Sequence, residues 1–164
     1  MRIVLVAFVG SIFVYTGCKA AGLGVEWRRQ QEVAIARIVL EDLIERPADW
    51  PAHEPRSICI SVGTAFGSPP RPPAPALITA LRQKHRDVFS VSECESGTDG
   101  VKHGADGRRA VLLGVAEPEW KDDSVVIIKG WRYIGPVSGA SWTYRLTREN
   151  NVWTVMTAKG DQIA

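Results

Sequence analysis

The sequence predicts an α+β domain, in which a long N-terminal helix and a second, shorter helix cover one face of an antiparallel sheet of about five to six strands. Residues 26–46 contain neither Gly nor Pro and repeat apolar side chains at helical spacing. From Val88 onward the period of the apolar residues changes to two, which is typical of strands. The order of helix, strand, helix and a run of strands therefore indicates the α+β class.

The composition is that of an ordinary globular protein. The chain has 164 residues, of which 45% are hydrophobic and 23% are charged. This length suits one domain and is sufficient to bury a core without a structural metal. The formal net charge is only +2, which argues against nucleic-acid binding and against a strongly basic membrane patch.

The N-terminal segment has the pattern of an export signal. Met1 and Arg2 give a short positive start, and residues 3–17 are uncharged and mostly large and apolar. An apolar stretch of about 15 residues suits a signal peptide and falls short of the ~20 that a membrane-spanning helix needs. The predicted division of the chain is a signal peptide over 1–17, a tether over 18–25 and a single globular domain over 26–164.

The run Thr16-Gly17-Cys18 resembles the end of a bacterial lipoprotein signal. In that family the signal ends in a small residue and a cysteine, and this cysteine is lipidated and becomes the mature N-terminus. The resemblance implies that Cys18 carries a lipid anchor. Lys19 stands where inner-membrane lipoproteins of this family have Asp, which favours the outer membrane, with the domain facing the periplasm.

Two other interpretations of this segment stay open. Cleavage by the general signal peptidase, for instance after Ala20 or Gly22, would leave a soluble secreted protein. An uncleaved signal reaching to Val25 would anchor the chain through its N-terminus, although Lys19 interrupts the apolar run. All three interpretations place the body of the chain outside the cytoplasm.

The cysteine count agrees with an oxidising compartment. The chain has three cysteines, and two remain to pair if Cys18 carries lipid. Cys59 and Cys94 both fall in strand-like stretches, on the same face as the neighbouring serines. A disulfide between them would close a loop of about 36 residues and stabilise the fold by roughly 3–4 kcal/mol. Two separate buried thiols are the alternative.

The first half of the chain contains the two predicted helices. The long helix covers residues 26–46 and ends before Pro47. Its apolar stripe consists of Val33, Ala36, Leu40, Leu43 and Ile44, and is widened by Ile35 and Val39. A strand is predicted near residues 57–63. A Pro-rich connection follows, and its last proline, Pro75, begins a second helix over about 75–86.

Five further strands are predicted near residues 88–95, 109–117, 124–134, 141–148 and 152–158. The last two form a hairpin, because a two-residue turn at Asn150-Asn151 places apolar residues opposite one another. Leu146, for example, lies opposite Val155. Asn tolerates the left-handed backbone that such a turn needs.

The closing stretch YRLTRENNVWTV resembles the last hairpin of the NTF2-like (cystatin-like) superfamily. There a Tyr-rich strand, a polar turn and a Trp-x-Val strand often finish the domain. The resemblance concerns the fold alone, and it implies no functional residue.

Five aromatic side chains form the main candidate for a binding surface: Trp131, Tyr133, Trp142, Tyr144 and Trp153. Strand alternation allows them to line one face of three consecutive strands. Such a face could be a platform for sugars or for the apolar surface of a partner. The alternative is that these rings belong to the core beneath the helices.

Catalytic and metal-binding motifs are absent from the sequence. The three histidines, His53, His85 and His103, are not part of HExxH, and there is no CxxC, GxSxG, Walker or GxGxxG motif. The stretch from Glu93 to Asp106 is rich in possible metal ligands, but its spacing matches no EF-hand loop and basic residues nearby would repel a cation. We therefore predict no catalytic residue, metal or cofactor.

These observations predict an exported, non-enzymatic binding or interaction domain that is tethered to the outer membrane through Cys18. Its partner would be an unknown protein or small ligand. The alternatives are a secreted or periplasmic enzyme with a site in the cleft between helices and sheet, and a structural component of the envelope. A pocket that gathers His103 or His85 with carboxylates would favour the enzyme, and a flat exposed aromatic face would favour the binding domain.

Overall fold

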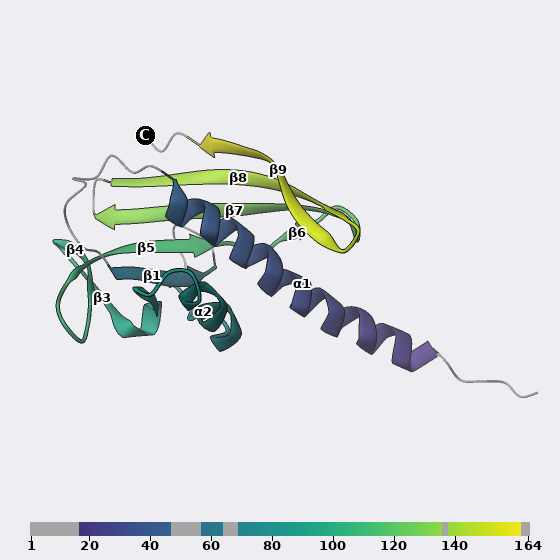
Figure 1. Cartoon of the computed structure of the whole chain (residues 1–164), viewed down its shortest axis with the longest axis horizontal. Coiled ribbons are helices and arrows are strands. Elements are labelled where there is room, and N and C mark those ends of the chain that lie inside the picture. Colours follow the sequence, from purple (N-terminus) through teal and green to yellow (C-terminus); the bar gives the residue numbers. More distant parts are fainter. Residues whose placement is uncertain (1–16, 47–56, 64–68, 136–137, 162–164) are drawn as a thin grey trace, which may run out of the picture.

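A mixed sheet with both helices packed on one of its faces forms the described part of the chain, as Figure 1 shows. The computed structural model describes residues 17–46, 57–63, 69–135 and 138–161. In chain order its elements are α1 (Gly17–Glu45), β1 (Ser57–Val62), α2 (Pro75–Arg82), β2 (Val88–Ser90), the 3₁₀ helix η1 (Val91–Glu93), β3 (Cys94–Gly97), β4 (Gly100–His103), β5 (Arg109–Val115), β6 (Glu119–Trp120), β7 (Val125–Gly135), β8 (Ser138–Glu149) and β9 (Val152–Asp161).

The sheet contains nine strands, and six of them follow one path in the order β2-β1-β5-β7-β8-β9. β1 pairs in parallel with β2 and with β5, whereas β5, β7, β8 and β9 pair antiparallel. The prediction of an antiparallel sheet is therefore wrong for two pairs, β1 with β2 and β1 with β5. The reason is that α2 connects β1 to β2, and parallel neighbours need such a crossover. The predicted strand count is too low, because β3, β4 and β6 are only two to four residues long.

The larger core lies between the helices and the sheet. The buried residues of α1 all belong to the predicted apolar stripe and are Ile35, Ala36, Val39, Leu40 and Leu43. The buried residues of α2 are Leu77, Ile78 and Leu81. At Gly130, α1 comes so close to β7 that an added Cβ would lie 2.9 Å from a methyl carbon of Val39. Close contact between α1 and the centre of the sheet therefore fixes the position of the helix.

A hydrogen-bonded trio attaches the C-terminal end of α1 to the sheet. The hydroxyl of Tyr144, on β8, donates to Asp42 Oδ2 at 2.7 Å, and Arg46 Nε donates to the same oxygen at 2.6 Å. Burial raises the pKa of Tyr144 above its ordinary value, so the hydroxyl remains a donor at neutral pH. The trio therefore satisfies the polar group of a fully buried tyrosine.

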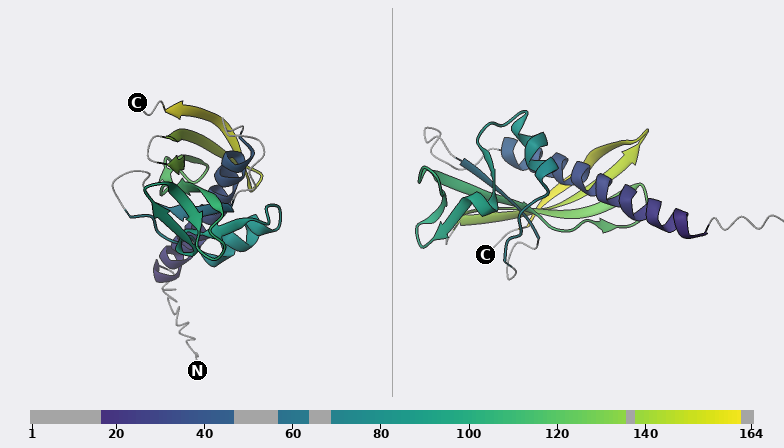
Figure 2. Two further views of the ribbon diagram at one scale, coloured as in Figure 1. Left: turned by 90° about the vertical axis from the view of Figure 1, so that its left-hand side faces the viewer. Right: turned by 90° about the horizontal axis from the view of Figure 1, so that it is seen from below.

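The N-terminal part of α1 extends beyond the strands, as the views in Figures 1 and 2 show. The helix begins at Gly17 rather than at residue 26. Where it reaches the sheet, Trp27 lies against Trp120 of β6, with ring centroids 5.8 Å apart. One turn further along, Gln31 accepts a hydrogen bond of 2.9 Å from Trp153 Nε1. In the part of the chain that the structure describes, neither helix is long and apolar enough to cross a membrane.

A disulfide crosses a smaller core on the opposite face of the sheet. The predicted pairing is confirmed, because Cys59 of β1 is bonded to Cys94 at the start of β3, with Cα atoms 6.4 Å apart. The other buried members of this core are Val101, Ala110, Leu112 and Trp131. The hairpin of β3 and β4 is therefore held against the sheet by a covalent bond and a few apolar contacts.

The predicted hairpin of β8 and β9 is also confirmed. Leu146 pairs with Val155, and the turn residues Asn150 and Asn151 adopt φ angles of 50° and 64°. Asparagine accepts this left-handed conformation at small cost. Beyond the turn a β-bulge shifts the register between Arg145 and Leu146.

Candidate functional site

A groove opens at the carboxyl ends of the parallel strands β1 and β5, between α1 and the segment that leads into α2. Val62 and Val115, the last residues of these strands, are paired in register and both line the groove. Its volume is about 390 Å³, within the usual range for small-molecule sites. Ligand sites of open α/β sheets commonly lie at the carboxyl ends of parallel strands.

The floor of the groove is apolar and belongs to the main core. Its apolar side chains include Val33, Ala36, Val62, Leu77, Val115 and Ile128. Four of these residues, Ala36, Leu77, Val115 and Ile128, are buried. A floor made of core side chains keeps its shape, because their conformations are set by close packing.

One wall of the groove is held in place by β1. Arg71 forms an isolated antiparallel bridge with Val62, whose N–H donates to the Arg71 carbonyl at 2.9 Å. The hydroxyl of Ser61 donates to the same carbonyl at 3.3 Å. The Arg71 guanidinium in turn donates to Glu117 at 2.6 Å. The two charges of this wall therefore neutralise each other across the groove's edge.

The facing wall is α1, which contributes Arg29 and Glu32. These residues lie three positions apart in the helix, so their side chains lie on neighbouring parts of one helix face. Neither forms a hydrogen bond or ion pair with another residue in the described ranges. The groove thus combines an apolar floor with a rim that carries both charges and is neutral in sum.

A second hollow, of about 340 Å³, lies beside the hairpin of β3 and β4 and is lined by His103, Glu93 and Glu95 among others. His103 is buried, its Nδ1 lies 2.9 Å from Asp106 Oδ1, and its ring is stacked on Phe89 with centroids 3.9 Å apart. The backbone N–H of Arg108, aided by the side chains of His103 and Arg108, lowers the pKa of Asp106 to about 2.

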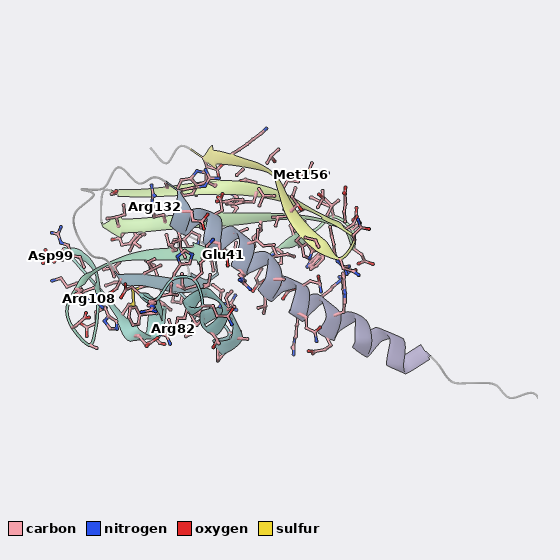
Figure 3. All side chains as sticks on the ribbon, viewed as in Figure 1. Glu41, Arg82, Asp99, Arg108, Arg132 and Met156 are labelled. Atoms are coloured by element: carbon pink, nitrogen blue, oxygen red, sulfur yellow. A yellow bond between two sulfur atoms is a disulfide. The ribbon has the colours of Figure 1, made fainter. Side chains whose placement is uncertain are left out.

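Glu93, one of the two carboxylates that line this second hollow, has structural partners. Glu93 accepts the backbone N–H of Ser90 at 2.8 Å in a capping box, and the guanidinium of Arg82 lies 3.4 Å away. Figure 3 shows Arg82 and Arg108 at this end of the molecule. No three His, Cys, Asp or Glu side chains of the described segments gather so that they could hold a metal ion. The positions of Glu93, His103 and Asp106 are therefore explained by their contacts within this region.

The five predicted aromatic residues do not share one face, so this expectation is wrong. Trp131 and Tyr133 pack in the smaller core, whereas Trp142, Tyr144 and Trp153 pack in the larger one. The reason is the register, in which Trp131 lies opposite Ser141 and Trp142 lies opposite Gly130. Trp131, Tyr144 and Trp153 are buried. The predicted binding role therefore rests on the two half-buried rings, Tyr133 and Trp142.

None of the remaining predicted residues whose side chains are described lines the groove. Cys18 falls within α1, but its side chain is outside the described residues, as are His53 and residues 1–16 of the predicted signal peptide. His85 lines neither of the two hollows. Sequence reasoning missed Arg29, Glu32, Arg71 and Glu117, since nothing in three distant segments indicates that they meet.

Comparisons with family models, with curated proteins and with solved structures found no match to this chain. The resemblances of Cys18 to a lipoprotein signal and of the last hairpin to the NTF2-like superfamily therefore stay predictions.

Proposed function

We propose that this chain is an exported, lipid-anchored domain that binds an apolar ligand in the groove at the carboxyl ends of β1 and β5. The apolar groove itself carries the proposal. It has the volume of a ligand site, a floor of rigid core residues and a neutral rim. Its titratable side chains are two arginines and two glutamates, of which Arg71 and Glu117 pair with each other. Such a lining suits binding better than catalysis.

Export and lipidation are supported by other features. The N-terminal pattern resembles a lipoprotein signal, and disulfides such as that between Cys59 and Cys94 are typical of oxidising compartments. The outer membrane, facing the periplasm, is the proposed location. The membrane would be reached through the lipid on Cys18.

Lipidation predicts a mature chain that begins at Cys18 and carries acyl chains. Intact mass spectrometry of the protein from a bacterial membrane fraction measures both features. The Cys18→Ser variant should lack the acyl mass and the cleavage before residue 18. An unacylated mature chain that begins elsewhere, for instance after Ala20 or Gly22, would contradict this part of the proposal.

Ligand binding in the groove predicts saturable binding of N-phenyl-1-naphthylamine, whose fluorescence rises in apolar sites. The sample is the Cys18→Ser chain exported behind a signal that the general signal peptidase cleaves, because it then has neither an acyl chain nor an uncleaved apolar segment to hold the dye. Ala74 lines the groove and has an extended backbone with ψ 138°, which accepts a large side chain before proline. We expect Ala74→Trp to fill the groove and to weaken dye binding about tenfold.

The matched control is Ala76→Trp, which places the same ring on an exposed position of α2 that does not line the groove. It should bind the dye as the parent chain does. Absence of saturable binding in the parent chain, or equal weakening by both substitutions, would refute the groove as the ligand site.

A further inference from the structure

Among the residues that the structure describes, the rim of the groove has one cation and one anion that form no ion pair or hydrogen bond with a side chain. Arg29 is exposed and Glu32 is half-buried, and both face the groove from α1. On the other wall, Arg71 and Glu117 already form an ion pair. A ligand that pairs with both Arg29 and Glu32 therefore needs a negative and a positive group close together. These groups must be attached to an apolar body that covers the floor of the groove.

The length of α1 between Cys18 and the groove limits how far the groove can lie from the membrane. This step rests on the proposed function, because it takes Cys18 as the site of the lipid. α1 is continuous from Gly17 to Glu45, and a rise of about 1.5 Å per residue places Arg29 about 16 Å from Cys18 along the helix axis. In any orientation of the helix, the mouth of the groove then lies close to the headgroup layer of the membrane.

We propose that the groove holds an acyl chain of a zwitterionic phospholipid, with the phosphate at Arg29 and the ammonium at Glu32. A guanidinium suits a phosphate because its N–H groups match the spacing of the phosphate oxygens. Glu32 supplies the selectivity, since it attracts an ammonium and repels the headgroup of an anionic lipid. The apolar floor takes the chain, whose removal from water provides most of the affinity.

The test measures displacement of N-phenyl-1-naphthylamine from the exported Cys18→Ser chain by lipids kept below their micelle-forming concentration. Dihexanoyl phosphatidylethanolamine is compared with dihexanoyl phosphatidylglycerol, with hexanoic acid and with the peptide Leu-Leu. The variants are Arg29→Gln and Glu32→Gln. The matched control is Arg28→Gln, because Arg28 is the next residue of the helix and pairs with Asp123 outside the groove.

We expect phosphatidylethanolamine to displace the dye at the lowest concentration. Arg29→Gln should weaken this displacement about fivefold, as befits a charge at a solvated rim. Glu32→Gln should abolish the preference over phosphatidylglycerol. Arg28→Gln should change neither, and all variants should bind the dye itself as the parent chain does.

Each other result overturns the inference in a distinguishable way. If Leu-Leu or hexanoic acid displaces the dye at a lower concentration than phosphatidylethanolamine does, the groove binds an apolar ligand that is not a phospholipid. The inference is then wrong, and the proposed function still holds. If phosphatidylethanolamine displaces the dye equally well from the parent chain and from both rim variants, Arg29 and Glu32 do not bind the headgroup. A parent chain that does not bind the dye loses the proposed function as well.

Discussion

Replacing both bridging cysteines, Cys59→Ala together with Cys94→Ala, is expected to lower the free energy of unfolding by about 3–4 kcal/mol. The bond joins residues that are 35 positions apart. A cross-link that closes a long loop removes many conformations from the unfolded chain, and this loss stabilises the folded state. The bond also crosses the smaller core, which has few buried members, so the hairpin of β3 and β4 depends on it strongly.

Urea unfolding followed by tryptophan fluorescence measures this difference. Trp131 belongs to the same small core as Cys59, so it reports on the affected region. The control is Cys18→Ser, which removes a cysteine that takes no part in the bond and should leave the free energy of unfolding unchanged. Equal unfolding midpoints for the paired alanine variant and this control would show that the bond adds no stability.

Local patterns in the sequence were sufficient to predict the apolar face of α1 and the hairpin of β8 and β9. The apolar stripe of α1 repeats at helical spacing, and its predicted members Ala36, Leu40 and Leu43 are buried. The hairpin of β8 and β9 follows from strict alternation and from the turn at Asn150 and Asn151, whose left-handed backbone asparagine accepts. Both features depend on residues that are close in the chain.

The parallel strands could have been found in the sequence but were not. The helix that begins at Pro75 separates two apolar runs, β1 and β2, and this arrangement is typical of a parallel pair. The many strands that follow favoured an antiparallel sheet instead. The second parallel pair, between β1 and β5, could not be predicted from such an arrangement, because the hairpin of β3 and β4 lies between these two strands in the sequence.

The prediction of one shared aromatic face is wrong for a reason that the sequence of a single strand does not reveal. Alternation places Trp131 and Tyr133 on one side of β7, and Trp142 and Tyr144 on one side of β8. Whether the two pairs meet depends on the register, and a shift of one residue moves a strand's side chains to the opposite face. The groove was missed for a similar reason, because its rim combines Arg29 with residues from two later segments.

A side chain at Gly130 is expected to destabilise the protein and to disturb the groove at the same time. A Cβ at this position would lie 2.9 Å from Val39 Cγ1 and 3.0 Å from atoms of both Leu43 and Tyr144. Gly130→Val therefore overpacks the interface between α1 and the sheet, and we expect it to lower the free energy of unfolding by about 2–3 kcal/mol.

The same substitution should weaken dye binding, because the overlap at Val39 pushes α1 away from β7, and Ala36, one turn before Val39, lines the groove. The control is Gly97→Val in β3, where an added Cβ would have no atom within 4 Å. It should change neither stability nor dye binding by a comparable amount. Urea unfolding and dye titration of both variants separate the two effects. A Gly130→Val variant of unchanged stability would show that α1 is not held at this contact. A destabilised variant with unchanged dye binding would show that the groove does not depend on the position of α1.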